Sequence, residues 1–132
     1  MLVLTTRPNL EKAREVGDRI PDRCLGNPIC RMITVIQFGN RTRVMQYLLS
    51  ASVRHGLDSE AKRLQKRYMA KGLSRDARSD IYAVADFNGQ TAAQLDLQSS
   101  TEFQVLVLAH DGTLVRAWTS VPSAEELAAA LP

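Results

Sequence analysis

Near its C-terminus the chain carries an apolar run, a turn and a capped helix, and this stretch constrains the fold more than any other. Val105–Ala109 is apolar without interruption, which is typical of a strand buried on both faces. Asp111–Gly112 signals a tight turn, because both residue types tolerate positive φ, and a second strand is predicted at Thr113–Trp118. Ser123 and Glu126 have the spacing of a capping box, which begins a helix. We therefore expect a β-hairpin followed by a C-terminal helix packed against it.

Strands and helices alternate through the rest of the chain. Apolar and β-branched runs predict further strands at Leu2–Thr5, Met32–Phe38 and Ile81–Asp86. Helical spacing and capping residues predict helices at 9–20, 41–71 and 91–97. The order β-α-β-α-β-α-β-β-α predicts an α/β protein with a mixed central sheet, because helical crossovers join parallel strands and the hairpin adds an antiparallel pair. Its core strands are expected to be Met32–Phe38, Ile81–Asp86 and Gln104–Ala109.

The long helical region from Arg41 to Lys71, with Asn40 as a candidate N-cap, carries two apolar stripes that are out of phase. The first comprises Val44, Tyr47, Leu48 and Ala51, and the second comprises Leu57, Ala61, Leu64 and Tyr68. Between them, His55 and Gly56 predict a kink or break, because glycine is a poor helix former. A break at His55–Asp58 would let both stripes pack on one sheet.

The length and the charge of the chain limit its domain number and its possible partners. The chain has 132 residues, enough for one core, and no linker divides it, so residues 1–132 are expected to form a single domain. The net charge is +3, but its distribution is uneven. Residues 1–53 carry 8 basic and 4 acidic groups, residues 54–78 carry 8 and 3, and residues 79–132 carry 1 and 7. This uneven charge distribution is compatible with an anionic partner, with head-to-tail self-association or with two solvent-exposed charged faces.

The sequence also bears on location. No apolar run approaches the ~18 residues that a membrane span needs, so no membrane association is expected. The first residues, Met1–Thr6, lack the charged and apolar regions of a signal peptide. We expect a cytoplasmic protein, or a periplasmic one if a leader has been removed.

The stretch from Tyr82 to Leu131 resembles the C-terminal half of thioredoxin-like proteins of the peroxiredoxin and thiol-reductase type. A strand ends in Asp86-Phe-Asn-Gly89, and a short helix, an apolar strand, an Asp-Gly turn, another strand and a capped helix follow. The pattern is most similar to that of the small bacterial YtfJ-like proteins, which also lack the redox motif. This resemblance covers about 50 residues and implies a thioredoxin-like three-layer sandwich.

The resemblance implies a redox site that this sequence does not contain. Thioredoxin-like enzymes place a cysteine where the main N-terminal strand meets its helix, a junction identified here with Phe38–Arg43, which has no cysteine. They also place a cis-proline before the strand at Val105, and no proline occurs between Gly89 and Pro122. We therefore expect a non-catalytic module rather than an enzyme. The same places supply candidate binding residues, Asn40, Arg41, Arg43 and Thr101.

The two cysteines leave open the alternative of an unconventional thiol redox protein. Cys24 and Cys30 have five residues between them, which suits a displaced redox switch, a structural disulfide or two inert thiols. Together with His55 and His110 they match no standard zinc spacing, so neither a metal nor a cofactor is predicted.

A second alternative is anion or nucleic-acid binding through the basic segment 54–78. Its candidate residues are Arg63, Lys66 and Arg67, and the pairs Lys62/Lys66 and Arg63/Arg67 each share a helical face. Only Tyr68 lies near as a stacking aromatic, so nucleic acid is disfavoured, and a solvated helix face is the plainer interpretation. A protein partner or a homo-oligomer is the partnership we expect first.

Overall fold

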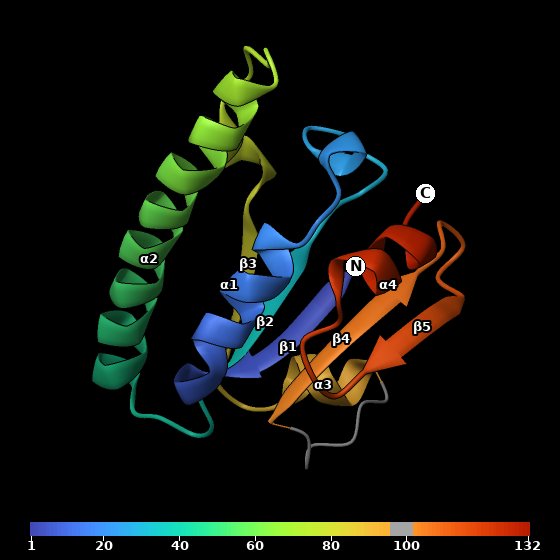
Figure 1. Ribbon diagram of the computed structural model, residues 1–132. Helices are drawn as coiled ribbons and strands as arrows, with labels where there is room; N and C mark the ends of the chain where they lie inside the picture. Colours follow the sequence, from blue (N-terminus) through green and yellow to red (C-terminus); the bar gives the residue numbers. More distant parts are fainter. Residues whose placement is uncertain (96–101) are drawn as a thin grey trace.

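Figure 1 shows the computed structural model of the chain, which describes residues 1–95 and 102–132. The strands are β1 (Leu2–Thr6), β2 (Ile33–Gln37), β3 (Tyr82–Asp86), β4 (Phe103–Leu108) and β5 (Leu114–Trp118). The α-helices are α1 (Leu10–Asp18), α2 (Arg43–Ala70), α3 (Gln90–Gln94) and α4 (Ala124–Ala130). Short 3₁₀ turns lie at Arg7–Asn9, Asp22–Cys24 and Ala77–Asp80. The predicted α/β class and order of elements are confirmed.

Within the described ranges the strands form one mixed sheet in the order β3-β2-β1-β4-β5. Strands β1, β2 and β3 are parallel, whereas β4 runs antiparallel to both β1 and β5. The predicted hairpin and the core strands Met32–Phe38 and Gln104–Ala109 are therefore confirmed. Ile81–Asp86 forms a strand as predicted, but it lies at the edge of the sheet, and the centre is occupied by β1.

Most of the apolar packing lies on one face of the sheet. Val3 and Val105, which are paired in register, lie in a buried cluster with Ala13 and Val16 of α1 and Leu127 of α4. Helix α2 covers the β2–β3 half of this same face, where Leu49 packs against Ile36 and Phe38. Leu4, Val35 and Leu106 form a cluster on the opposite face, on which α3 lies (Figure 1). The chain thus builds an uneven sandwich with its helices concentrated on one side.

A local sequence signal accounts for the start of helix α4. Ser123 accepts a hydrogen bond from the backbone N–H of Glu126, and the Glu126 carboxylate accepts one from the N–H of Ser123 at 2.7 Å, so the predicted capping box begins α4. These contacts lower the pKa of Glu126, the backbone bond from Ser123 contributing most. Helix α3 lies at Gln90–Gln94, and the end of the helix predicted at 91–97 lies outside the described residues.

Helix α2 is one uninterrupted helix of 28 residues, so the predicted break at His55–Asp58 is wrong. Gly56 has no positive φ, and a Cβ at that position would meet nothing within 4 Å. The propensity cost of one glycine, about 1 kcal/mol, is small beside the hydrogen bonds and packing of a long helix. Among the described helices, none is long and apolar enough to span a membrane.

Candidate docking surface on helix α2

The N-terminus of α2 is held in place by its own loop. Thr42 is the N-cap, and its side-chain oxygen accepts a hydrogen bond from the N–H of Met45. Arg41 donates through Nε to the carbonyl oxygen of Phe38 at 3.0 Å, and Gln46 donates to the carbonyl oxygen of Arg41 at 2.9 Å. These bonds fix the first turn of the helix at the carboxyl end of β2. Among the predicted binding residues, Asn40, Arg41 and Arg43 all lie exposed here.

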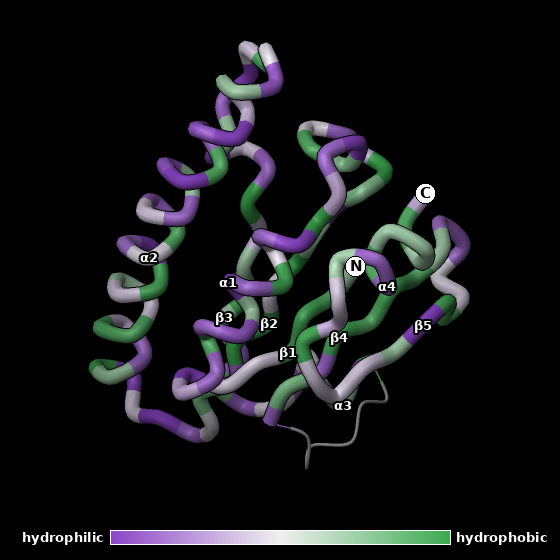
Figure 2. The backbone as a smooth tube through the Cα atoms, in the orientation of Figure 1, coloured by the Kyte–Doolittle hydropathy of each residue, from purple (hydrophilic) through white to green (hydrophobic). Residues whose placement is uncertain are grey.

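Beside them the helix presents an apolar surface to solvent. We call it the outer patch and define it as Val44, Tyr47, Leu48 and Ala51. The side chains of Val44 and Tyr47 are 73% and 71% exposed, and that of Leu48 is 55% exposed. Figure 2 shows hydrophobic residues on these turns of α2, on the side turned away from the sheet. Soluble proteins leave single apolar residues exposed, and a contiguous group on one helix face is a candidate interaction site.

The outer patch is exposed because α2 is straight. At 3.6 residues per turn, the first apolar stripe and the second point about 120° apart around the helix axis. The second stripe, with Leu57, Leu64 and Tyr68, faces the sheet, and Tyr68 is only 1% exposed. A rigid helix cannot bury both stripes against one surface, so the first stripe faces outward.

The charge around the outer patch has one sign. From Gly39 to Leu57 the chain has three arginines, one histidine and no acidic residue. Arg43 and Arg54 form no ion pair with any residue that the structure describes. Unlike the arginines farther along the helix, they are available to an anionic partner.

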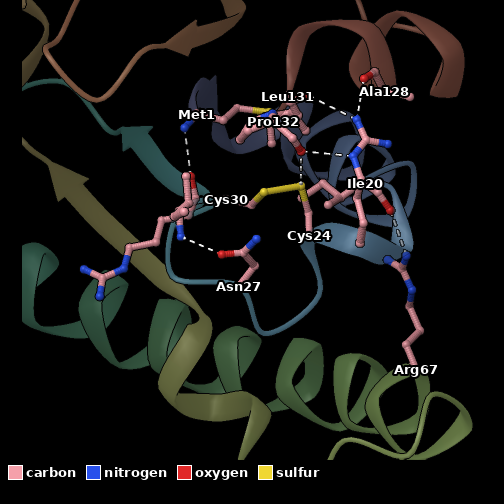
Figure 3. Close-up of a disulfide and its surroundings, with 12 residues drawn as sticks. Met1, Ile20, Cys24, Asn27, Cys30, Arg67, Ala128, Leu131 and Pro132 are labelled. Atoms are coloured by element: carbon pink, nitrogen blue, oxygen red, sulfur yellow. Dashed lines mark hydrogen bonds between the residues drawn. A yellow bond between two sulfur atoms is a disulfide. The ribbon is translucent and has the colours of Figure 1, made fainter.

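The arginines in the C-terminal half of α2 bond to other parts of the protein. Arg63 pairs with Asp18 of α1 at 2.6 Å, and Arg14 of α1 pairs with Glu60 of α2. Arg67 donates to the carbonyl oxygens of Gly17 and Ile20, as Figure 3 shows for Ile20.

Asp22 joins this set of contacts from the loop after α1. Lys71 lies 2.6 Å from its carboxylate and Arg67 lies 3.4 Å from it. The hydrogen bond from Lys71, followed by that from Arg67, lowers the pKa of Asp22. Two of the three candidate anion-binding residues, Arg63 and Arg67, are thus engaged with α1 and its loop, while Lys66 faces solvent.

The two cysteines form a disulfide that closes the loop between α1 and β2. Cys24 is buried under the C-terminal residues, where Figure 3 shows Leu131 and Pro132 lying over it. Arg23 donates to the carbonyl oxygens of Ala128, Leu131 and Pro132, which fastens the C-terminus above the disulfide. No group of metal-ligating side chains occurs among residues 1–95 and 102–132.

Phe38–Arg43, which the sequence resemblance identified as the junction, follows β2. Strand β4 neighbours β1 instead, with Thr5 paired to Phe103, and the junction that follows β1 is Thr6–Asn9. This junction contains no cysteine either. The fourth candidate, Thr101, lies outside the described residues.

A cavity of about 270 Å³ lies beneath α2, between that helix, α1 and the β2–β3 half of the sheet. Its polar end is formed by Tyr68, whose hydroxyl donates to Asp80 at 2.8 Å, and Arg75 holds the same carboxylate at 2.7 Å. Burial, followed by the bond to Asp80, raises the pKa of Tyr68 to about 12.

Comparisons with known proteins assign no family to the chain. No family model, no curated protein and no solved structure matches the chain.

Proposed function

We propose that this chain is a non-catalytic interaction module of thioredoxin-like type that binds an acidic segment of a partner protein through the outer patch of α2. The observation that carries the proposal is the outward stripe Val44, Tyr47, Leu48 and Ala51 on a rigid, well-capped helix. Tyrosine and bulky aliphatic side chains are the residues that anchor protein interfaces. A preformed helix also lowers the ordering cost of binding.

The positive charge around the outer patch favours a negatively charged partner. An acidic segment would pair with Arg43 and Arg54 at the rim while its apolar residues cover the patch. A second copy packed about a two-fold axis would instead bring two sets of arginines around one apolar centre, which costs repulsion energy. The acidic residues of α2 offer little relief, since Asp58 pairs with Arg78 and Glu60 pairs with Arg14.

Two features support the thioredoxin-like part of the proposal. The element order and the sheet order β3-β2-β1-β4-β5 provide parallel strands on one side of β1 and an antiparallel hairpin on the other. Both candidate redox junctions lack cysteine, which is the reason for proposing binding instead of thiol chemistry at that edge.

The proposal is tested with a synthetic amphipathic peptide that has leucine at i, i+3, i+4 and i+7 and glutamate elsewhere. We expect it to bind the protein in a calorimetric titration, more weakly as salt is raised, while the same peptide with lysine in place of glutamate does not bind. Leu48→Asp should abolish binding. Leu114→Asp is the matched control, because Leu114 on β5 is also 55% exposed, and it should bind as the wild type does.

Two results would overturn this function. Equal binding by Leu48→Asp and Leu114→Asp would show that the outer patch is not the site. A dimer in sedimentation experiments that Leu48→Asp converts to a monomer would identify a second copy as the occupant.

A further inference from the structure

The cavity beneath α2 is an elongated, partly open groove, which we call the channel. On α2 its lining runs from Leu49 to Tyr68, which at 1.5 Å per residue is about 28 Å. A volume of about 270 Å³ spread over that length is narrow, so it suits a linear chain better than a compact ring system.

The walls are kept apart by small residues. Gly17 of α1, Gly56 of α2 and Ala83 of β3 all line the channel. Gly56 is exposed, and a Cβ there would meet nothing within 4 Å, so a larger side chain has room at this edge of the channel. Much of the remaining lining is aliphatic, including Leu10, Ile36 and Leu57, and water in such a site finds few hydrogen-bond partners.

The two ends of the channel differ in their free polar groups. At the end nearer Tyr68, the phenol and the carboxylate of Asp80 already bind each other, and the guanidinium of Arg31 lies over the ring of Tyr82. At the opposite end lies Arg7, whose guanidinium forms no hydrogen bond or ion pair with the residues that the structure describes. An unpaired guanidinium beside an apolar channel suits one anionic head group attached to an apolar tail.

We propose that this channel binds a linear amphiphile with a carboxylate head, of the fatty-acid class, with the head at Arg7 and the tail running beneath α2 toward Tyr68. Helices α1 and α2 are joined across the channel by the pairs Arg14–Glu60 and Arg63–Asp18. The proposal is independent of the outer patch, which lies on the other side of α2.

The test uses cis-parinaric acid, a fluorescent fatty acid, with the full chain. Wild-type protein should bind the probe, and Gly56→Leu, which adds a bulky side chain at a lining position, should weaken binding at least about tenfold. Ser59→Leu is the matched control, because it adds the same side chain at an exposed position of α2 that does not line the channel, and its affinity should be unchanged. Arg7→Gln should weaken binding of the acid about tenfold and leave binding of its methyl ester unchanged.

Three results would overturn the proposal. The first is an absence of parinarate binding to the wild type, and the second is equal binding by Gly56→Leu and the wild type. The third is loss of binding in Leu48→Asp but not in Gly56→Leu, which would place the probe on the outer patch. If circular dichroism shows that Gly56→Leu does not fold, the acid-against-ester comparison in Arg7→Gln decides, and equal weakening of both rejects the assigned head-group site.

Discussion

The guanidinium of Arg67, on α2, donates a hydrogen bond to the main-chain oxygen of Ile20 at 2.9 Å, and its second nitrogen reaches the oxygen of Gly17 at 3.1 Å. The last carbonyl groups of a helix lack partners within the helix, and here a side chain from another helix bonds to carbonyl oxygens at and just after the end of α1. Residues 47 and 50 positions apart in the sequence are joined in this way. Arg67 therefore ties the two helices together where they flank the channel.

We expect Arg67→Met to destabilise the fold by about 1.5–3 kcal/mol, because it removes the charged hydrogen bonds to the carbonyl oxygens of Gly17 and Ile20. Lys66→Met, at the exposed neighbouring position, should change stability by less than about 0.5 kcal/mol. Urea unfolding followed by circular dichroism measures both. Equal effects at the two positions would refute the capping role of Arg67.

A test of nucleic-acid binding needs a variant that preserves the contacts between α2 and α1. Reversing the charge of Arg63 or Arg67 would break contacts to α1, so Lys62→Glu with Lys66→Glu is the cleaner change. If the proposed function holds, fluorescence anisotropy at about 50 mM salt should show no binding of DNA or RNA to the wild type. Binding at that salt concentration that the double variant removes would instead favour the basic-face hypothesis.

Gly56→Ala should stabilise the protein by about 1 kcal/mol, since Gly56 lies inside a continuous helix and its missing Cβ has free space. Gly72→Ala is the contrasting variant, because Gly72 has φ +68° and alanine there is strained. Thermal unfolding should therefore show a gain for the first variant and a loss for the second. A loss in both would mean that α2 is bent at Gly56.

The stability of the protein should fall as pH rises from about 10 to about 12. Tyr68 has its pKa raised to about 12 in the folded state, mainly by burial, against about 10 in the unfolded chain. The folded state therefore holds the proton more tightly, and its advantage is complete below pH ~10 and lost as pH approaches ~12. The slope is at most about 1.4 kcal/mol per pH unit. Tyr68→Phe should lack this loss when unfolding is measured across the same pH range.

Opening the disulfide should cost about 2 kcal/mol, which is the loop-closure entropy of a six-residue separation. Reduced wild type and the double variant Cys24→Ala, Cys30→Ala should lose similar amounts in urea unfolding. An unchanged midpoint on reduction would show that the bond does not restrain the unfolded chain.

The same bond separates binding from redox chemistry. The protein should not accelerate insulin reduction by dithiothreitol above the buffer control, because Cys24 is buried under the C-terminal residues. Turnover that Cys30→Ser abolishes would revive the hypothesis of an unconventional redox protein.

Local chemistry made the C-terminal half of the fold predictable. The turn at Asp111–Gly112 and the capping box of Ser123 and Glu126 act between neighbours in the sequence, and both appear in the structure. The central position of β1 was not predictable in this way. It depends on pairing with β4, about 100 residues away, for which one sequence carries no local signal.

Periodicity also has a limit at the candidate site. It grouped Val44 with Leu48 and Leu57 with Leu64 correctly, but it does not say which stripe meets the sheet. The expected kink followed from assuming that every apolar stripe is buried. The N-cap lies at Thr42 and not at Asn40, a shift of two residues that a short polar run leaves undetermined.

Arginine bonds to main-chain oxygens recur in this fold, with Arg19 holding the strand-to-helix turn at Pro122, Arg23 the C-terminus and Arg75 the loop at Gly26. A peptide oxygen does not titrate, and the guanidinium ion stays protonated at every ordinary pH. Acid therefore leaves these bonds intact. A guanidinium salt supplies a free ion with the same charge and planar donors, so it competes with these arginines for the peptide oxygens, whereas urea offers them only uncharged donors.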